Sequence, residues 1–122
     1  MALRLSANPP TEARGDRTAS VDRRSWLFEE EGVAVALLGV EVYEDQRAGC
    51  AFVVDPRQRG RGCGQRALQA LVRHVASTGV RELFAGAEPE NSASIRCLEG
   101  AGFVSRSDKP DAEGFLYFVR AI

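Results

Sequence analysis

The sequence is poor in the residues that build metal sites. Among its 122 residues there is one His, and the three Cys residues, Cys50, Cys63 and Cys97, show no C-x-x-C spacing. Zinc sites are built from several closely spaced Cys and His ligands, so we expect no metal. An odd number of free thiols is typical of a protein from a reducing cytosol.

A surplus of basic residues is missing as well, and so is a long apolar run. Sixteen Lys and Arg residues against seventeen Asp and Glu residues give a net charge of −1. This balance argues against a nucleic-acid or membrane-surface binder. No stretch approaches the roughly 20 apolar residues of a membrane span, and the first residues show no apolar signal region. We therefore expect a cytoplasmic protein that binds neither nucleic acid nor membrane.

Residues 1–25 carry the weakest structural signal. Leu3 and Leu5 alternate with polar residues, as in a short edge strand, and a Pro-Pro pair then interrupts the chain. Residues 11–25 are polar and Arg-rich, which is typical of a loop, a short helix or a partly disordered segment. We expect a short N-terminal segment over residues 1–25 and one domain, with an ordinary core, over residues 26–122.

Short apolar runs and turn residues alternate along that domain. Three strands joined by tight polar turns predict an antiparallel meander, and an amphipathic helix follows. The next strand should pair parallel to the third, because a strand-helix-strand crossover favours that arrangement. The fold class is therefore α/β (α+β), a mixed sheet in which the meander precedes a parallel β-α-β pair. The expected strands are 26–29, 33–43, 48–54, 81–87, one from 104, and 115–120, and the expected helices are 62–77 and 91–102.

A glycine-dense turn between the third strand and the first helix predicts an anion site. The stretch Phe52–Ala67 reads FVVDPRQRGRGCGQRA. Glycines permit close backbone approach, and the first N–H groups of a helix have no intrahelical acceptor, so they can point at phosphate oxygens. Arg59, Arg61 and Arg66 bring full positive charges to the same place. The pattern indicates a cradle for a pyrophosphate.

Other interpretations of this turn stay open. Gly62-x-Gly64-x-x-Ala67 fits a dinucleotide fingerprint, but that fold turns directly from strand to glycines and ends the next strand on an acidic residue, whereas Glu82 begins it here. A P-loop would need a Gly-Lys-Ser/Thr sequence. An Arg-Gly tract for nucleic acid has little support in a nearly neutral chain. The turn could also be purely structural.

Two motifs resemble those of the GCN5-related N-acetyltransferase (GNAT) superfamily. One is the coenzyme A loop after the third strand, and the other is the last helix with the strand entry behind it; together they cover about residues 26–122. The resemblance implies a GNAT-like sheet with a shortened N-terminal region. The matching residues are Val53, Pro56, Arg59, Gly62 and Gly64 in the loop, then Asn91, Ser94, Cys97-Leu98-Glu99 and Gly102-Phe103.

The resemblance further implies transfer of an acetyl group from acetyl-coenzyme A to a primary amine. Direct attack in a ternary complex is expected, because no activated Cys or Ser nucleophile is evident. Backbone N–H groups around Val53 would hold the oxyanion. The residues expected to bind coenzyme A are Phe52, Val53, Val54, Arg59, Gly60, Arg61, Gly62, Cys63, Gly64, Gln65, Asn91 and Ser94.

The acid that protonates the leaving thiolate is not obvious. Family members often place a Tyr seven residues after the Asn, and that position is Leu98 here. Asn91, Ser94 and Leu98 fall on one helical stripe, so we expect catalytic roles for Asn91 and Ser94, with Ser94 or an ordered water as the acid. Ser94 could instead satisfy backbone groups at the helix start. Cys97 is interpreted as a small buried hydrophobic residue.

Glu41 is the first candidate for the base, followed by Glu88 and then residues 29–31. An amine with a pKa of about 10 is mostly protonated at neutral pH, so a carboxylate or a water relay would help it to attack. The alternative for each of these carboxylates is an ordinary solvated side chain. Asp55 is more typical of a cap on the turn before Pro56.

The acceptor is expected to be an amine on a small molecule or, second, on a peptide. Family members usually have a strand and two helices before the strand at 26–29, and these wall the acceptor site. Only 25 residues precede Trp26, so we expect an open acceptor side or one completed by a second copy in a homodimer. The rival interpretation is a catalytically weak or inactive acyl-coenzyme A-binding module that acts as a sensor or subunit, which Leu98 and the short N-terminal region favour.

Overall fold

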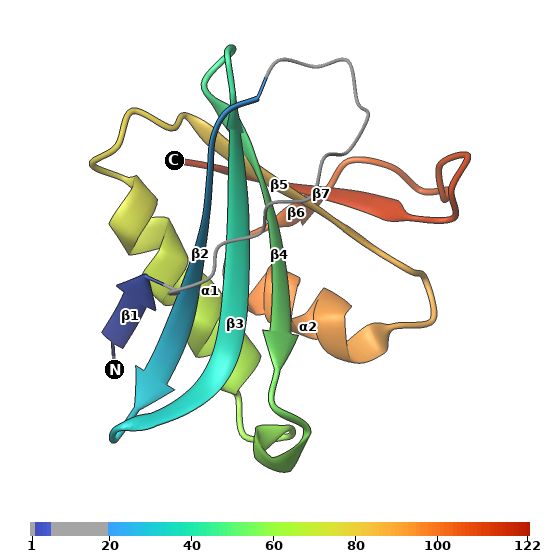
Figure 1. The fold of residues 1–122 in the computed structure, drawn as a ribbon. Coiled ribbons are helices and arrows are strands. Elements are labelled where there is room, and N and C mark those ends of the chain that lie inside the picture. Colours follow the sequence, from blue (N-terminus) through green and yellow to red (C-terminus); the bar gives the residue numbers. More distant parts are fainter. Residues whose placement is uncertain (1, 6–19) are drawn as a thin grey trace.

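A single mixed sheet organises the part of the chain that the computed structural model describes, residues 2–5 and 20–122 (Figure 1). Seven strands in these ranges follow the order β1-β2-β3-β4-β5-β7-β6, and of the neighbouring pairs only β4 and β5 run parallel. Both α-helices cover the same face, which is the far face in Figure 1. The strands are β1 (Ala2–Leu5), β2 (Ser20–Glu30), β3 (Val33–Tyr43), β4 (Arg47–Val54), β5 (Glu82–Ala87), β6 (Val104–Ser105) and β7 (Leu116–Ala121), and the helices are η1 (Pro56–Gln58, 3-10), α1 (Cys63–Val75) and α2 (Ser92–Gly100).

The predicted meander, crossover and parallel pair are confirmed, and most element ends fall within two residues of expectation, the usual uncertainty. The expected edge strand at Leu3 and Leu5 is β1, which pairs with β2. The expected start of the first meander strand at Trp26 is wrong, because this strand, β2, already begins at Ser20. Its polar first half pairs with the equally long β3, whose register includes Arg23 opposite Glu41. The rest of the polar segment, residues 11–19, and the Pro-Pro pair before it lie outside the described residues.

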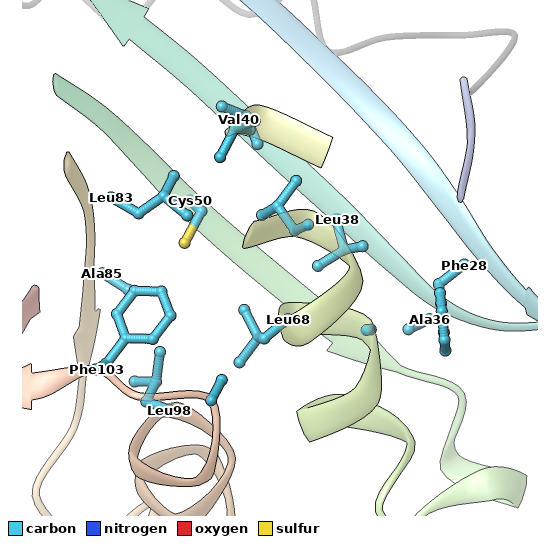
Figure 2. Close-up of a cluster of buried hydrophobic side chains, with 14 of the residues drawn as sticks. Phe28, Ala36, Leu38, Val40, Cys50, Leu68, Leu83, Ala85, Leu98 and Phe103 are labelled. Atoms are coloured by element: carbon cyan, nitrogen blue, oxygen red, sulfur yellow. The ribbon is translucent and has the colours of Figure 1, made fainter. Parts of the chain in front are cut away.

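The core lies between the sheet and the two helices. Helix α1 buries Ala67, Leu68, Leu71 and Val75 at helical spacing, as its apolar periodicity predicts. Figure 2 shows Leu68 of α1 among side chains from β3, β4 and β5, and Leu98 of α2 beside Phe103. Each of these fully buried large side chains contributes roughly 1.5–3 kcal/mol by leaving water. This shared core packs both helices against the sheet.

Strands β4 and β5 pair over only three residues each. Their register ends at Gly49 opposite Phe84, although β4 continues to Val54 and β5 to Ala87. The outer sides of both strands stay paired to their ends, β4 with β3 and β5 with β7. A gap therefore opens between two firmly held strands, and Figure 1 shows β4 and β5 separating toward their ends. The site described next lies around this gap.

Candidate functional site

The turn that follows β4 is held by Asp55. Its carboxylate accepts from the backbone N–H of Arg57 at 2.9 Å and pairs with the Arg57 guanidinium at 3.1 Å, while its own N–H donates to Val35 O at 2.9 Å. The hydrogen bonds from Arg57 lower the pKa of Asp55. The predicted capping role of Asp55 before Pro56 is confirmed. The glycine loop thus leaves the end of β4 in a fixed direction.

Two glycines give the loop its shape. Gly60 and Gly62 have φ angles of 78° and 77°, a left-handed conformation that other residues adopt at a cost. Gly62 is the N-cap of α1 and contributes no side-chain cap to the helix. The first intrahelical bond runs from Arg66 N–H to Gly62 O. The N–H groups of Cys63 and Gly64 precede that bond, which makes the helix start a donor surface with positive character.

Gly64 lets α1, β4 and α2 meet closely. A Cβ on Gly64 would lie 2.8 Å from Cys97 Sγ, 3.2 Å from a Val54 methyl carbon and 3.4 Å from the Phe52 ring. The Sγ of Cys97 also accepts a hydrogen bond from the backbone N–H of Gln65. The helix start, the strand end and α2 therefore converge on one point.

A hollow of about 700 Å³ lies where these elements converge, and we call it the loop-side hollow. It contains every residue that we predicted to bind coenzyme A except Arg61, whose guanidinium instead contacts Gln58 Oε1 at 3.4 Å. The hollow is lined by Phe52, Val53, Val54, Gln58, Arg59, Gly60, Gly62, Cys63, Gly64, Gln65, Asn91, Ala93, Ser94, Arg96 and Cys97.

The cations at this hollow differ from those expected. Arg66 binds Glu30 at the end of β2, with Nε–Oε2 and Nη2–Oε1 distances of 2.6 and 2.9 Å, and it is not among the lining residues. This pairing raises the pKa of Arg66 and lowers that of Glu30. Arg66 therefore ties α1 to β2, and its Nη1 also donates to Arg61 O of the glycine loop at 2.9 Å. Its charge lies beside the loop, as expected, but is paired with Glu30. Arg96 of α2, which our sequence analysis missed, lines the hollow with Arg59.

The expected stripe on α2 also needs correction. Asn91 is the N-cap, with non-helical backbone angles, and its Oδ1 accepts from Ser94 N–H at 3.2 Å. Counting helical offsets from Asn91 was therefore misleading. Leu98 is 1% exposed and belongs to the core, whereas Ser94 and Cys97 line the hollow. Ser94 is the residue whose N–H the Asn91 side chain caps. An i, i+3 pattern counted from Ser94 would have predicted that Cys97 lies on the same side of the helix.

A second hollow, of about 470 Å³, lies against the sheet face opposite the helices, and we call it the sheet-face hollow. Glu41, our first candidate base, lies in it, with 2.7 Å from its Oε2 to Arg23 Nη2 and 3.0 Å from its Oε1 to the Tyr43 hydroxyl. Glu88 and residues 29–31 line neither hollow. The lining residues are Arg23, Arg24, Gly39, Val40, Glu41, Tyr43, Gly49, Cys50, Ala51, Phe84, Ala85, Gly86, Asp111, Glu113, Phe115 and Tyr117.

The two hollows lie on opposite sides of β4, beside its gap with β5. Ala51 lines the sheet-face hollow, and the next residue, Phe52, lines the loop-side hollow. Backbone N–H groups alternate sides along a strand, and Asp55 N–H donates to β3. Val53 N–H therefore also faces β3, where Leu37 is its register partner. The N–H groups of Phe52 and Val54 face the gap.

The thiols around this gap are protonated at neutral pH. Burial raises the pKa of Cys97, and burial together with the nearby Glu30 carboxylate raises that of Cys63. Burial raises the pKa of Cys50 to about 12. None of the three is therefore a ready thiolate nucleophile.

Two absences hold for residues 2–5 and 20–122, the part of the chain that the structure describes. Within these ranges, no group of three or more His, Cys, Asp and Glu side chains is placed to hold a metal ion. The helices found there are too short and too polar to cross a membrane.

The model of the acetyltransferase (GNAT) family matches residues 4–103. The uncharacterized N-acetyltransferase YfmK of Bacillus subtilis is 33% identical over 89 residues, covering 73% of this chain and 60% of that protein. The L-methionine sulfoximine/L-methionine sulfone acetyltransferase of Salmonella typhimurium is 28% identical over 116 residues, covering 78% and 66%. This chain thus spans only about 60–66% of the length of these two relatives.

Among solved structures, the aminoglycoside acetyltransferase AAC(6')-Ib in complex with coenzyme A and kanamycin superposes with a TM-score of 0.71 at 21% identity. The superposition covers 81% of this chain and 66% of that one. At this identity the likeness concerns the fold.

Proposed function

Since the chain belongs to the acetyltransferase (GNAT) family, we propose that it transfers an acetyl group from acetyl-coenzyme A to a primary amine on a small molecule. Transfer proceeds by direct attack in a ternary complex. The observation that carries this proposal is the gap between β4 and β5, because the loop-side hollow lies on one side of it and the sheet-face hollow on the other. A thioester entering from one side can meet an amine entering from the other.

The loop-side hollow suits the diphosphate end of coenzyme A. The backbone from Arg59 to Gly64 and the uncapped start of α1 offer N–H donors to phosphate oxygens. Arg59 and Arg96 add positive charge at the same hollow, which Ser94 also lines. In support, the related aminoglycoside acetyltransferase was solved with coenzyme A bound. Acetyl-coenzyme A is therefore the co-substrate that we propose.

Backbone N–H groups at the gap would stabilise the oxyanion that forms when the amine attacks. The pairing of β3 with β4 favours Phe52 and Val54 as donors over Val53. Since β3 holds the other side of β4, these donors are fixed before the reaction begins. Preorganised donors of this kind are typically worth about 3–4 kcal/mol each in transition-state stabilisation.

Proton transfer would use one carboxylate and one small side chain. Glu41 faces the sheet-face hollow, where it can accept a proton from the acceptor's ammonium group, directly or through water, and so release the free amine that attacks the thioester. Ser94 lines the loop-side hollow and is our proposed donor to the leaving thiolate. Cys97, protonated and on the same wall, is a second donor to compare with it. A thiol has a pKa of about 8.5, so its thiolate leaves tolerably well and loss of either donor should slow the reaction rather than stop it.

The rival function is an acyl-coenzyme A-binding module without catalysis. It is favoured by the core position of Leu98, which leaves the usual Tyr without a counterpart. Release of free thiol from acetyl-coenzyme A, measured with a panel of amines, separates the two. Turnover with at least one amine supports the enzyme, whereas tight binding without turnover on any amine supports the module. Sedimentation of the same samples tests whether the acceptor side is completed in a homodimer.

A further inference from the structure

An aromatic band crosses the floor of the sheet-face hollow. The Phe84 ring lies between two tyrosine rings, 6.0 Å from Tyr43 and 5.6 Å from Tyr117 between centroids, at interplanar angles of 23° and 27°. The Arg47 guanidinium lies 4.8 Å from the Phe84 centroid and donates to the Tyr117 hydroxyl at 2.9 Å. Arg47 and its ion pair with Glu82 at 2.7 Å therefore hold the band in place.

Glycines make room for this band and for a ligand on it. A Cβ on Gly49 of β4 would lie 3.1 Å from the Phe84 ring, so Gly49 lets that ring reach across β4 toward Tyr43. A Cβ on Gly39 of β3 would meet no atom within 4 Å, which leaves open space in the hollow at that point. The volume of about 470 Å³ lies within the usual range of roughly 300–1,000 Å³ for small-ligand sites.

The mouth of the hollow is acidic. Asp111 fixes the loop before β7, because its Oδ1 accepts from the N–H groups of Glu113 and Phe115 at 2.9 Å each. This loop places both carboxylates and the half-exposed Phe115 ring along the hollow. A cation that enters here meets carboxylates and aromatic rings, both of which attract positive charge.

The basic groups of the hollow are already engaged. Arg23 pairs with Glu41 at 2.7 Å, and Arg24 pairs with Asp22 at 3.0 Å. A ligand carboxylate would therefore compete with existing ion pairs and approach the acidic mouth. This arrangement disfavours acceptors that carry a carboxylate next to the amine, such as amino acids.

We propose that the sheet-face hollow takes a primary amine that is carried on a flat apolar ring and has no carboxylate. The ring lies on the band of Tyr43, Phe84 and Tyr117, and the ammonium group points along the gap past Glu41. Gly49 of β4 is the register partner of both Glu41 on β3 and Phe84 on β5, so these two side chains flank it, one for each part of the ligand. This inference names the acceptor class and rests on the proposed acetyl transfer for its catalytic consequence.

Binding tests the inference independently of catalysis. Calorimetric titration of the full chain, saturated with coenzyme A, compares 2-phenylethylamine with L-phenylalanine, which differs only by its carboxylate. We expect the amine to bind at least about tenfold more tightly, corresponding to about 1.4 kcal/mol. Equal or tighter binding of phenylalanine overturns the inference, and so does the absence of binding by 2-phenylethylamine.

Variants locate the ligand on the band. Phe84→Leu should weaken binding of 2-phenylethylamine about tenfold while Tyr117→Phe, which keeps the ring, should change it less than about threefold. If Phe84→Leu does not fold, Gly39→Ala replaces it. Its methyl group enters open space in the hollow without touching a protein neighbour, so it should weaken binding of 2-phenylethylamine by occupying ligand space. Unchanged amine binding in both Phe84→Leu and Gly39→Ala overturns the placement.

Turnover separates the two levels of the account. If thiol release occurs with 2-phenylethylamine and is at least about tenfold less efficient with phenylalanine, both the activity and the acceptor class stand. If 2-phenylethylamine binds selectively but no amine is acetylated, the acceptor class stands and the proposed activity fails. If phenylalanine or an aminosugar is the better substrate, the acceptor class is overturned and the activity stands.

Discussion

Arg23 and Glu41 are register partners on β2 and β3, and 2.7 Å separates the Arg23 Nη2 atom from the Glu41 Oε2 atom. Together with the Tyr43 hydroxyl at 3.0 Å, this contact fixes the direction of the Glu41 carboxylate within the sheet-face hollow. Arg23 lies in the segment expected to be a loop, a short helix or partly disordered. The unexpected start of β2 at Ser20 therefore supplies the residue that orients the proposed base.

Replacing Glu41 by Gln should lower kcat with amine acceptors by roughly a hundredfold at neutral pH, the usual range for loss of a general base. The loss should shrink as the pH rises toward about 10, because more of the amine is then unprotonated without help. The pH profile of kcat checks this. Glu88→Gln is the matched control, since Glu88 is exposed and lines neither hollow. A Glu41→Gln profile that overlays the wild type at every pH would remove Glu41 from the mechanism.

Gly64→Ala should lower both stability and affinity for coenzyme A. The added Cβ would lie 2.8 Å from Cys97 Sγ and 3.2 Å from Val54, so α1 must move away from β4 and α2. Overpacking of this kind typically costs about 1–3 kcal/mol of unfolding free energy. Urea unfolding and calorimetric titration with coenzyme A measure the two effects. Gly39→Ala, which meets no neighbour, should leave unfolding nearly unchanged; an equal loss there would argue against the packing explanation.

Arginines that line the loop-side hollow should contribute to coenzyme A binding, whereas an exposed arginine elsewhere on the surface should not. Arg59→Gln and Arg96→Gln should each weaken coenzyme A binding several-fold, and the difference should fade at high salt because these cations are solvent-exposed. Arg73→Gln, also exposed but on α1 away from the loop-side hollow, serves as the control. If Arg73→Gln weakens binding as much as Arg59→Gln, the loop-side hollow has no special role in holding phosphate.

The Glu30–Arg66 pair should contribute stability that depends on pH. The hydrogen bond from Arg66 lowers the pKa of Glu30 in the folded state below its ordinary value of 4.5. The contribution is therefore fully present above that value and is lost as the pH falls through the lower, folded-state pKa. Because Arg66 is partly exposed, we expect only about 0.5–1 kcal/mol.

Urea unfolding of Glu30→Gln and of the wild type at pH 7 and pH 3 measures this contribution. At pH 7 the wild type should have a larger free energy of unfolding than Glu30→Gln, and this difference between the two proteins should be smaller at pH 3. A difference that grows on acidification would have the wrong sign for a carboxylate with a lowered pKa.

Much of the fold follows from local signals in the sequence. Apolar alternation predicts the strands, the period of Leu68, Leu71 and Val75 predicts the buried side of α1, and the glycine loop predicts where the two helices meet. These features depend on residues close in sequence, so a single chain suffices to find them.

Other features depend on partners that lie far apart in sequence. Arg66 carries no sign in the sequence that its partner is Glu30, 36 positions away, and so the ion pair that engages its charge was not predicted. The helical offset of Leu98 was misleading because it was counted from the non-helical Asn91. The sheet-face hollow brings together β2, β3, β4, β5 and the loop before β7, an arrangement that only the folded sheet reveals.

A crystal structure with acetyl-coenzyme A bound tests the central claim most directly. The account predicts the diphosphate against the amides between Arg59 and Gly64, and the thioester in the gap between β4 and β5 with its carbonyl oxygen accepting from Phe52 or Val54 N–H. A diphosphate bound elsewhere, or a thioester that stays outside the gap, would contradict it.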